Sequence, residues 1–151
     1  MKHSRNPHCI LFASVCLMAG TAFAAEPEDI IKYRQNVMKS QAAHLAAAGA
    51  IINGKVDFKG QLGDHAKALQ ATTKDIPGLF PKDSDFGETK ALDAVWQKNA
   101  EFQKLAKDTQ QKAGALAKAV AANDSKNYAA RFKDVADSCK ACHKDFRKEE
   151  K

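Results

Sequence analysis

The residues most suited to chemistry lie at positions 139–143, which read Cys-Lys-Ala-Cys-His. A Cys-x-x-Cys-His sequence is the attachment signature of a c-type haem. Each thiol forms a thioether with one vinyl group of the haem, and the histidine binds the iron on one side of the ring. On a helix, Cys139 and Cys142 lie one turn apart and His143 lies beside both, so the three side chains share a face. The motif therefore predicts one covalently attached haem c, with His143 as an axial iron ligand.

The first 24 residues are typical of a secretory signal peptide. A basic start precedes an apolar run from Ile10 to Gly20, and the small-x-small site Ala22-Phe23-Ala24 follows it. The apolar run has about eleven residues and is too short to span a bilayer. An uncleaved N-terminal anchor is the alternative. Cleavage near Ala24 predicts a periplasmic protein with no membrane insertion, whose domain covers residues 25–151.

Three other uses of the motif remain open. A zinc site formed by Cys139, Cys142 and His143 needs a fourth ligand, and the mature chain offers only His44 and His65 for it. A thioredoxin-like redox pair requires a βαβ context, and the chain shows none. A disulfide between the two cysteines closes too small a loop to stabilise much. It also leaves the histidine without a role, so haem is the favoured interpretation of the motif.

Four segments have the apolar periodicity of amphipathic helices, and these are about 28–52, 57–76, 90–122 and 125–147. Turn-forming sequences such as Asn53-Gly54 and Asn123-Asp124-Ser125 separate them. Gly60 and Gly63 weaken the first turn of the second helix. No segment alternates with a period of two residues, so no strand is expected. The predicted fold class is all-α, an antiparallel four-helix bundle with the haem in its core.

A second axial ligand has to come from elsewhere in the chain. Met38 is the only methionine of the mature chain, and it lies on the apolar face of the first predicted helix, with Arg34 one turn before it. Histidine–methionine ligation is known in electron-transfer cytochromes, which makes Met38 a candidate iron ligand; core packing is the alternative. Arg34 is a candidate partner for a haem propionate, or else a side chain laid along the helix surface. His44, at the edge of the same face, is a weaker candidate for the iron.

The sequence resembles the cytochrome c' family, the class II c-type cytochromes, over essentially the whole mature chain. The resemblance is carried by Tyr33-Arg34-Gln35, Met38, Leu79-Phe80-Pro81, Ser84, Ala91-Leu92, Val95-Trp96, Phe102, Cys139, Cys142, His143, Phe146 and Arg147. The position of the haem motif near the C-terminus is the discriminating feature, since small class I cytochromes carry it near the N-terminus. The resemblance implies a four-helix bundle and a homodimer formed through the first two helices.

The resemblance also implies one of two iron environments. In one branch of the family, a methionine of the first helix closes the sixth position and the iron is low-spin. In the other branch, a hydrophobic residue blocks that side, the iron is five-coordinate and high-spin, and the protein binds nitric oxide and carbon monoxide. Met38 and the Leu79-Phe80-Pro81 loop resemble the low-spin branch. We therefore expect a periplasmic carrier of single electrons, with His143 and Met38 on the iron and no enzymatic activity; a five-coordinate gas-binding protein is the alternative.

Charge bears on the partners of the protein. The formal net charge of +6 falls to +4 when Lys2 and Arg5 leave with the signal peptide. A modest positive charge favours association with an acidic redox partner in the periplasm. It is too small and too dispersed for nucleic acid, and no basic stripe is interleaved with aromatic residues.

Overall fold

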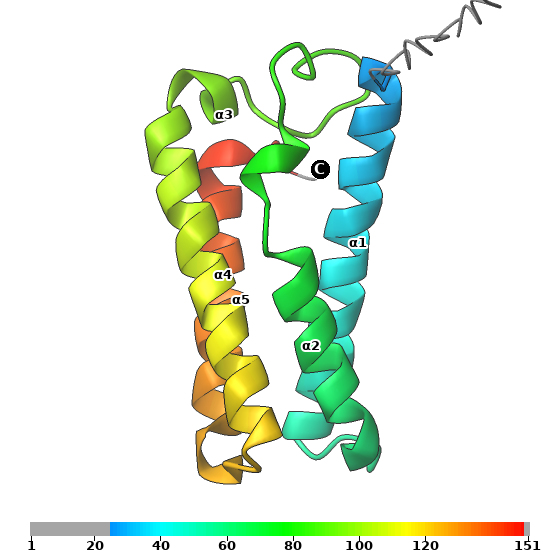
Figure 1. The fold of residues 1–151 in the computed structure, drawn as a ribbon, viewed down its shortest axis with the longest axis vertical. Helices are drawn as coiled ribbons and strands as arrows, with labels where there is room; N and C mark the ends of the chain where they lie inside the picture. Colours follow the sequence, from blue (N-terminus) through cyan, green and yellow to red (C-terminus); the bar gives the residue numbers. More distant parts are fainter. Residues whose placement is uncertain (1–24, 150–151) are drawn as a thin grey trace, which may run out of the picture.

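The computed structural model describes residues 25–149, so the predicted signal peptide lies outside the described residues. Four helices form an antiparallel bundle, and a short helix, α3, precedes the third of them (Figure 1). Their bounds are α1 (Pro27–Ile52), α2 (Leu62–Thr72), α3 (Ala94–Gln97), α4 (Asn99–Ala121) and α5 (Tyr128–Phe146). Within this range the only β pairing is an isolated bridge between Ala91 and Arg147. None of the helices described is both long enough and apolar enough to cross a membrane. The predicted all-α bundle is confirmed.

Two of the helix ends follow directly from local sequence. Gly54 follows α1 with φ +68°, and its N–H donates to the carbonyl of Ile51 at 3.1 Å. Asn123 follows α4 with φ +54°, and its N–H donates to the carbonyl of Val120 at 3.1 Å. Glycine and asparagine are the residues that most readily adopt this left-handed conformation at a helix C-terminus. Both predicted breaks are therefore confirmed.

The second and third predicted helices are shorter than expected. α2 begins at Leu62 rather than at residue 57, after a 3-10 turn over Lys59–Gln61, and it ends at Thr72 rather than at residue 76. Gly60 lies in the 3-10 turn that precedes α2, and glycine is about 1 kcal/mol less favourable than alanine in a helix, which agrees with the late beginning. The third helix begins at Ala94 and is interrupted at Lys98, which has φ −109° and ψ 42°. Lysine is a good helix former, so no local signal marks this interruption.

The interior contains two apolar clusters, one in each half of the bundle. The cluster near the α1–α2 and α4–α5 turns includes Ala48, Ile51, Leu62, Ala66, Leu69, Ala113, Leu116, Ala117, Val120 and Val135. The cluster near the long loop that joins α2 to α3 includes Ile76, Val95, Phe102, Ala106 and Phe146. The rings of Phe80, Phe102 and Phe146 stack edge to face in succession, with centroids 5.0 and 5.4 Å apart.

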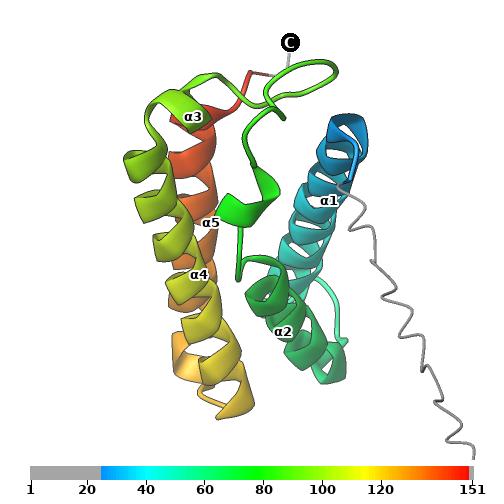
Figure 2. The same cartoon turned by 45° about the horizontal axis from the view of Figure 1, so that its top comes forward.

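α1 and α5 touch closely at one point and are separated beyond it. A Cβ added at Gly49 of α1 would lie 2.6 Å from Cζ of Phe132 on α5, closer than two carbon atoms approach without a shift. Overall, α1 and α5 share far fewer contacts than α4 and α5, α1 and α2, or α2 and α4. The two helices diverge toward the end of the bundle that carries the long loop (Figure 2). The small residue at position 49 thus sets the close end of a wedge between them.

Gly49→Leu should lower the free energy of unfolding of the haem-loaded protein by about 1–3 kcal/mol, because the new side chain meets the Phe132 ring. Phe132→Ala in the same chain should relieve the clash, so that the two substitutions together cost less than their sum. Ala46→Leu, on the exposed face of α1, is the matched control and should change stability by less than about 0.5 kcal/mol. Denaturant unfolding measures the native protein, Gly49→Leu, Phe132→Ala, the combined variant and Ala46→Leu. Equal losses in Gly49→Leu and Ala46→Leu would contradict the close contact.

Candidate functional site

A cavity of about 630 Å³ opens where α1 and α5 diverge. It is lined by residues of all four bundle helices and of the long loop. Most of its walls are apolar, and these residues are Met38, Ala42, Leu45, Leu69, Ile76, Phe80, Ala91, Val95, Phe102, Ala106, Val135, Ala136 and Phe146. Its size lies within the range of about 300–1,000 Å³ that is usual for cofactor and small-molecule sites.

All three residues of the haem motif line this cavity. Cys139 and Cys142 are half-buried on successive turns of α5, and both are free thiols rather than a disulfide. His143 follows directly and is exposed, so its imidazole forms part of the cavity wall at the solvent side. The prediction that these side chains share one face is confirmed. That face borders the cavity, and Cys139 and Cys142 also pack against the two apolar clusters.

Burial sets the protonation of these groups. Desolvation raises the pKa of the Cys139 thiol, although a hydrogen bond with Ser138 opposes the shift. Desolvation, and to a smaller extent the neighbouring Cys139 and Asp145, raises the pKa of Cys142 to about 11. Partial desolvation lowers the pKa of His143, with a smaller contribution from the positive charge of Arg147. The imidazole is therefore biased toward its neutral form, the form that binds metals.

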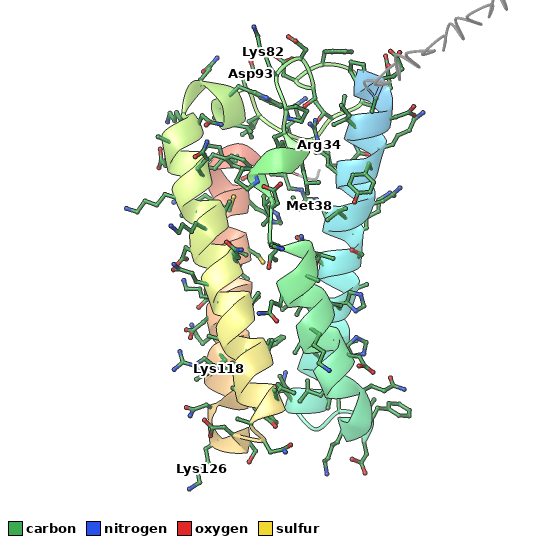
Figure 3. The ribbon with its side chains drawn as sticks, in the orientation of Figure 1. Arg34, Met38, Lys82, Asp93, Lys118 and Lys126 are labelled. Atoms are coloured by element: carbon green, nitrogen blue, oxygen red, sulfur yellow. The ribbon has the colours of Figure 1, made fainter. Side chains whose placement is uncertain are left out.

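Arg34 is buried at the end of the cavity, and its side chain is only 3% exposed. Its Nη1 donates to Ser84 Oγ at 2.7 Å, and its Nη2 donates to the Ser84 carbonyl at 2.7 Å and to Thr89 Oγ1 at 2.6 Å. These bonds join α1 to the long loop, 50 and 55 residues along the chain. The alternative of a side chain laid along the helix surface is wrong. Figure 3 shows Arg34 and Met38 on the side of α1 that faces the other helices.

Aromatic rings complete the surroundings of this guanidinium. Its central carbon lies 4.8 Å from the ring centroid of Phe80 and 5.7 Å from that of Trp96. Desolvation lowers the pKa of Arg34, and the charge of Asp85 opposes this shift. Three of its five N–H groups donate to the loop, which leaves Nε and one Nη1 proton for another acceptor. Since Arg34 also lines the cavity, its contact with a haem propionate stays a prediction.

Met38 and His44 differ in position: Met38 lines the haem cavity and His44 does not. Met38 is half-buried, lines the cavity and packs against the apolar cluster near the long loop. His44 is not among the lining residues, and its Nδ1 lies 3.0 Å from Nδ1 of His65 on α2. The structure therefore does not bring either of these two histidines to the haem motif. Within residues 25–149 no three His, Cys, Asp or Glu side chains are grouped to hold a metal ion, so the zinc alternative has no fourth ligand there.

The cavity residues fit a covalently bound haem. Two free thiols stand one helical turn apart, a neutral-biased imidazole lies beside them, and the walls that a flat apolar ring would contact are mostly aliphatic and aromatic. A buried cation with unused donors lies on the same cavity. Cys139 and Cys142 would hold a haem by thioether bonds, and the imidazole nitrogen of His143 would bind its iron. Sequence reasoning missed Thr89, because a single threonine in a polar loop carries no signal of its contact with α1.

The matches found by comparison with known proteins all point to one family. The family model described as Cytochrome C' matches residues 29–147. Cytochrome c' of Pararhodospirillum photometricum is 32% identical over 124 residues, which is 82% of this chain and 99% of the relative. Among solved structures, cytochrome c prime from Shewanella frigidimarina has a TM-score of 0.78 and 33% identity, with 84% of this chain and all of that chain covered. A nitric oxide complex of a mutant of cytochrome c prime from Alcaligenes xylosoxidans has a TM-score of 0.77 and 28% identity, covering 85% of this chain and 100% of that one.

The combined variant Cys139→Ala and Cys142→Ala should lose covalent haem, because no thiol remains to form a thioether. The protein is produced together with the haem-attachment machinery, denatured in acidic solvent and weighed. The native polypeptide should keep the mass of one haem, and the combined variant should not. His143→Ala should keep the haem mass but change the absorption spectrum. A haem mass that stays with the combined variant would contradict the assignment of the two cysteines.

Arg34→Met should lower the free energy of unfolding by about 1.5–3 kcal/mol, because buried acceptors in the loop lose charged hydrogen-bond donors. It should also speed amide hydrogen exchange across residues 80–91. Arg34→Lys should restore little, since one ammonium group lacks the planar fork that reaches several acceptors. Arg131→Met is the control, because it removes an exposed ion pair with Asp134 and should cost no more than about 1 kcal/mol. Unchanged exchange in the loop of Arg34→Met would show that this side chain does not hold it.

Proposed function

Because the chain belongs to the cytochrome c' family, whose members carry one covalently attached haem c per chain, we propose that it binds a small gas such as nitric oxide or carbon monoxide at five-coordinate iron. When bound, the haem would supply an iron atom, which His143 would hold and to which the gas would bind. The observation that carries this proposal is that α1 lines the cavity with the apolar side chains of Met38, Ala42 and Leu45 and with no histidine. The chain shares the fold and the haem of its family. Whether Met38 binds the iron together with His143 decides between electron transfer and gas binding.

None of the residues of α1 that line the cavity is a histidine, and these residues are Arg34, Gln35, Met38, Lys39, Gln41, Ala42 and Leu45. Met38, Ala42 and Leu45 line the cavity along α1, and the one histidine of this helix, His44, is hydrogen-bonded to His65 instead. Met38 packs among apolar side chains near the long loop, which is the usual role of a buried methionine. Polarity, hydrogen-bond donors and steric access around the iron decide which ligands a haem accepts. Apolar side chains at Met38, Ala42 and Leu45 favour small uncharged ligands over charged ones at those positions.

The relatives also favour gas binding over electron transfer with Met38 on the iron. The solved structures similar to this chain include nitric oxide complexes of cytochrome c prime from Alcaligenes xylosoxidans, at 28% identity. Electron transfer with Met38 as sixth ligand is the second candidate. It is favoured by the position of the Met38 side chain on the same cavity as His143.

The proposal extends to where and how the protein acts. Covalent haem attachment in bacteria takes place on the outer side of the membrane, so removal of residues 1–24 and action in the periplasm are part of it. The protein binds its gas ligand without transforming it and is not an enzyme. Pairing of two copies through α1 and α2 is part of the proposal. Docking of an acidic redox protein belongs to the second candidate, the electron carrier.

Carbon monoxide added to the reduced native protein should shift the main haem absorption band at near-stoichiometric concentration. Met38→Leu should leave the ferric spin state unchanged, because leucine fills a similar volume. It should also change the affinity for carbon monoxide by less than about tenfold, the usual limit for a volume-conserving apolar exchange. Leu45→Met is the matched control, since it places a thioether elsewhere on the same wall. The contrary result has two parts: the native protein does not bind carbon monoxide, and the Met38→Leu variant does. That result would establish Met38 as an iron ligand and favour the electron carrier.

A further inference from the structure

The charges that line the haem cavity are all of one sign. Five of the lining side chains are cationic and none is a carboxylate, and the five are Arg34, Lys39, Lys90, Lys140 and Arg147. Residues 25–149 have a net charge of +4, because the chain carries +6 in total and its two ends outside this range hold three of the cations and one of the acids. Without the five lining cations, the described chain would be one unit negative. Its positive excess therefore lies at this cavity.

Three of these cations surround the opening of the cavity. Lys39 lies on α1, Lys90 on the long loop and Lys140 on α5, and all three are exposed. Each of them also lines the cavity, so they lie where the cavity meets solvent. The helices that carry Lys39 and Lys140 are the two that diverge toward the long loop (Figure 2). We refer to these three lysines as the basic rim.

The basic rim lies beside the residues that would hold the haem. Lys140 stands between Cys139 and Cys142 in the motif, and the exposed His143 lines the same cavity. Thioether bonds to the two cysteines would therefore place one edge of a haem close to the basic rim. The two propionates of a haem would offset only two of the five lining cations, so the opening would stay positively charged.

We propose that the basic rim binds an acidic electron-donor protein, which passes one electron to the haem iron. The donor is oxidised by one electron and the iron is reduced from Fe³⁺ to Fe²⁺, so no proton or chemical group has to move. This inference gives a site to the docking that the electron-carrier candidate includes. It also extends that docking to the gas-binding candidate, because carbon monoxide binds ferrous iron. It rests on the covalent haem and on neither choice of group opposite His143.

A protein suits the basic rim better than a small anion does. The three lysines belong to separate segments and are exposed, and a single exposed ion pair contributes little to binding. Only a partner wide enough to meet several of these lysines gains much from them. Positive charge around a cavity with apolar walls also attracts an acidic partner from a distance and speeds association, an effect that salt weakens. An anionic lipid surface would meet the same lysines, but it supplies no electron.

The test uses the haem-loaded protein in its ferric form and fully reduced flavodoxin, a small acidic flavoprotein, as the electron donor. Stopped-flow absorption follows the reduction of the iron at about 10 mM and about 300 mM NaCl. The second-order rate constant of the native protein should fall at least about tenfold over this range, the lower end of what electrostatic attraction contributes to association. Combined Lys39→Gln, Lys90→Gln and Lys140→Gln should cause a similar fall at low salt.

The matched control removes three positive charges at the other end of the bundle. Lys55, Lys118 and Lys126 are exposed and lie near the α1–α2 and α4–α5 turns, and Figure 3 shows Lys118 and Lys126 far from Arg34. Replacing all three with glutamine should lower the rate constant less than about threefold, since charges more than a Debye length away are largely screened. Both combined variants should keep the native haem spectrum.

Binding is measured separately, with oxidised flavodoxin and the ferric protein, which exchange no electron. The largest changes in amide chemical shift should lie around the three positions of the basic rim. Changes centred on the α1–α2 and α4–α5 turns would contradict the proposed site. So would tighter binding to phosphatidylglycerol vesicles than to flavodoxin, which would assign the basic rim to a lipid surface.

Two kinetic results would also overturn the docking site, and neither depends on gas binding at the haem. The first is an equal rate constant at low salt in the rim variant and in the matched control. The second is a rate constant of the native protein that does not fall with salt, a result that stands even if the variants do not fold.

Discussion

One short stretch of α5 has to present two thiols and an imidazole to the same space, and the bundle is arranged around that requirement. Protein interiors are normally packed as closely as organic crystals, so a cavity of about 630 Å³ needs a structural cause. α1 approaches α5 closely at Gly49, against the ring of Phe132, and the two helices diverge toward the long loop (Figure 2). The cavity is the space that this divergence leaves beside Cys139 and Cys142.

The open end of this wedge is held by a buried charge. Placing a guanidinium in a protein interior is unfavourable unless hydrogen bonds replace its hydration. Arg34 meets this condition by donating to Ser84 and Thr89 and by lying against two aromatic rings. Loops are the least ordered segments of most proteins. The contacts of Arg34 fix this loop in place, so that it forms a wall of the haem cavity. Phe80 in that wall then packs on Phe102, which links the loop to α4.

The sequence was sufficient for features whose parts lie within one helical turn. The haem motif spans five residues, and the helix ends at Gly54 and Asn123 follow from the conformations of those residues alone. Features that join distant residues were not predictable in this way, since neither the Arg34–Ser84 bonds nor the His44–His65 pair has a local pattern. The role of Met38 could not be predicted from the sequence for a different reason. Its residue type and helical face are compatible with both an iron ligand and a packed wall, and the choice depends on the distance that the rest of the bundle sets.

The central claim is that no residue of the chain occupies the iron position opposite His143. The ferric native protein at neutral pH tests it most directly, by electron paramagnetic resonance together with the absorption spectrum in the near infrared. The account predicts a high-spin signal and no band from charge transfer between a thioether and the iron. A low-spin signal accompanied by that band would contradict it and would place Met38 on the iron.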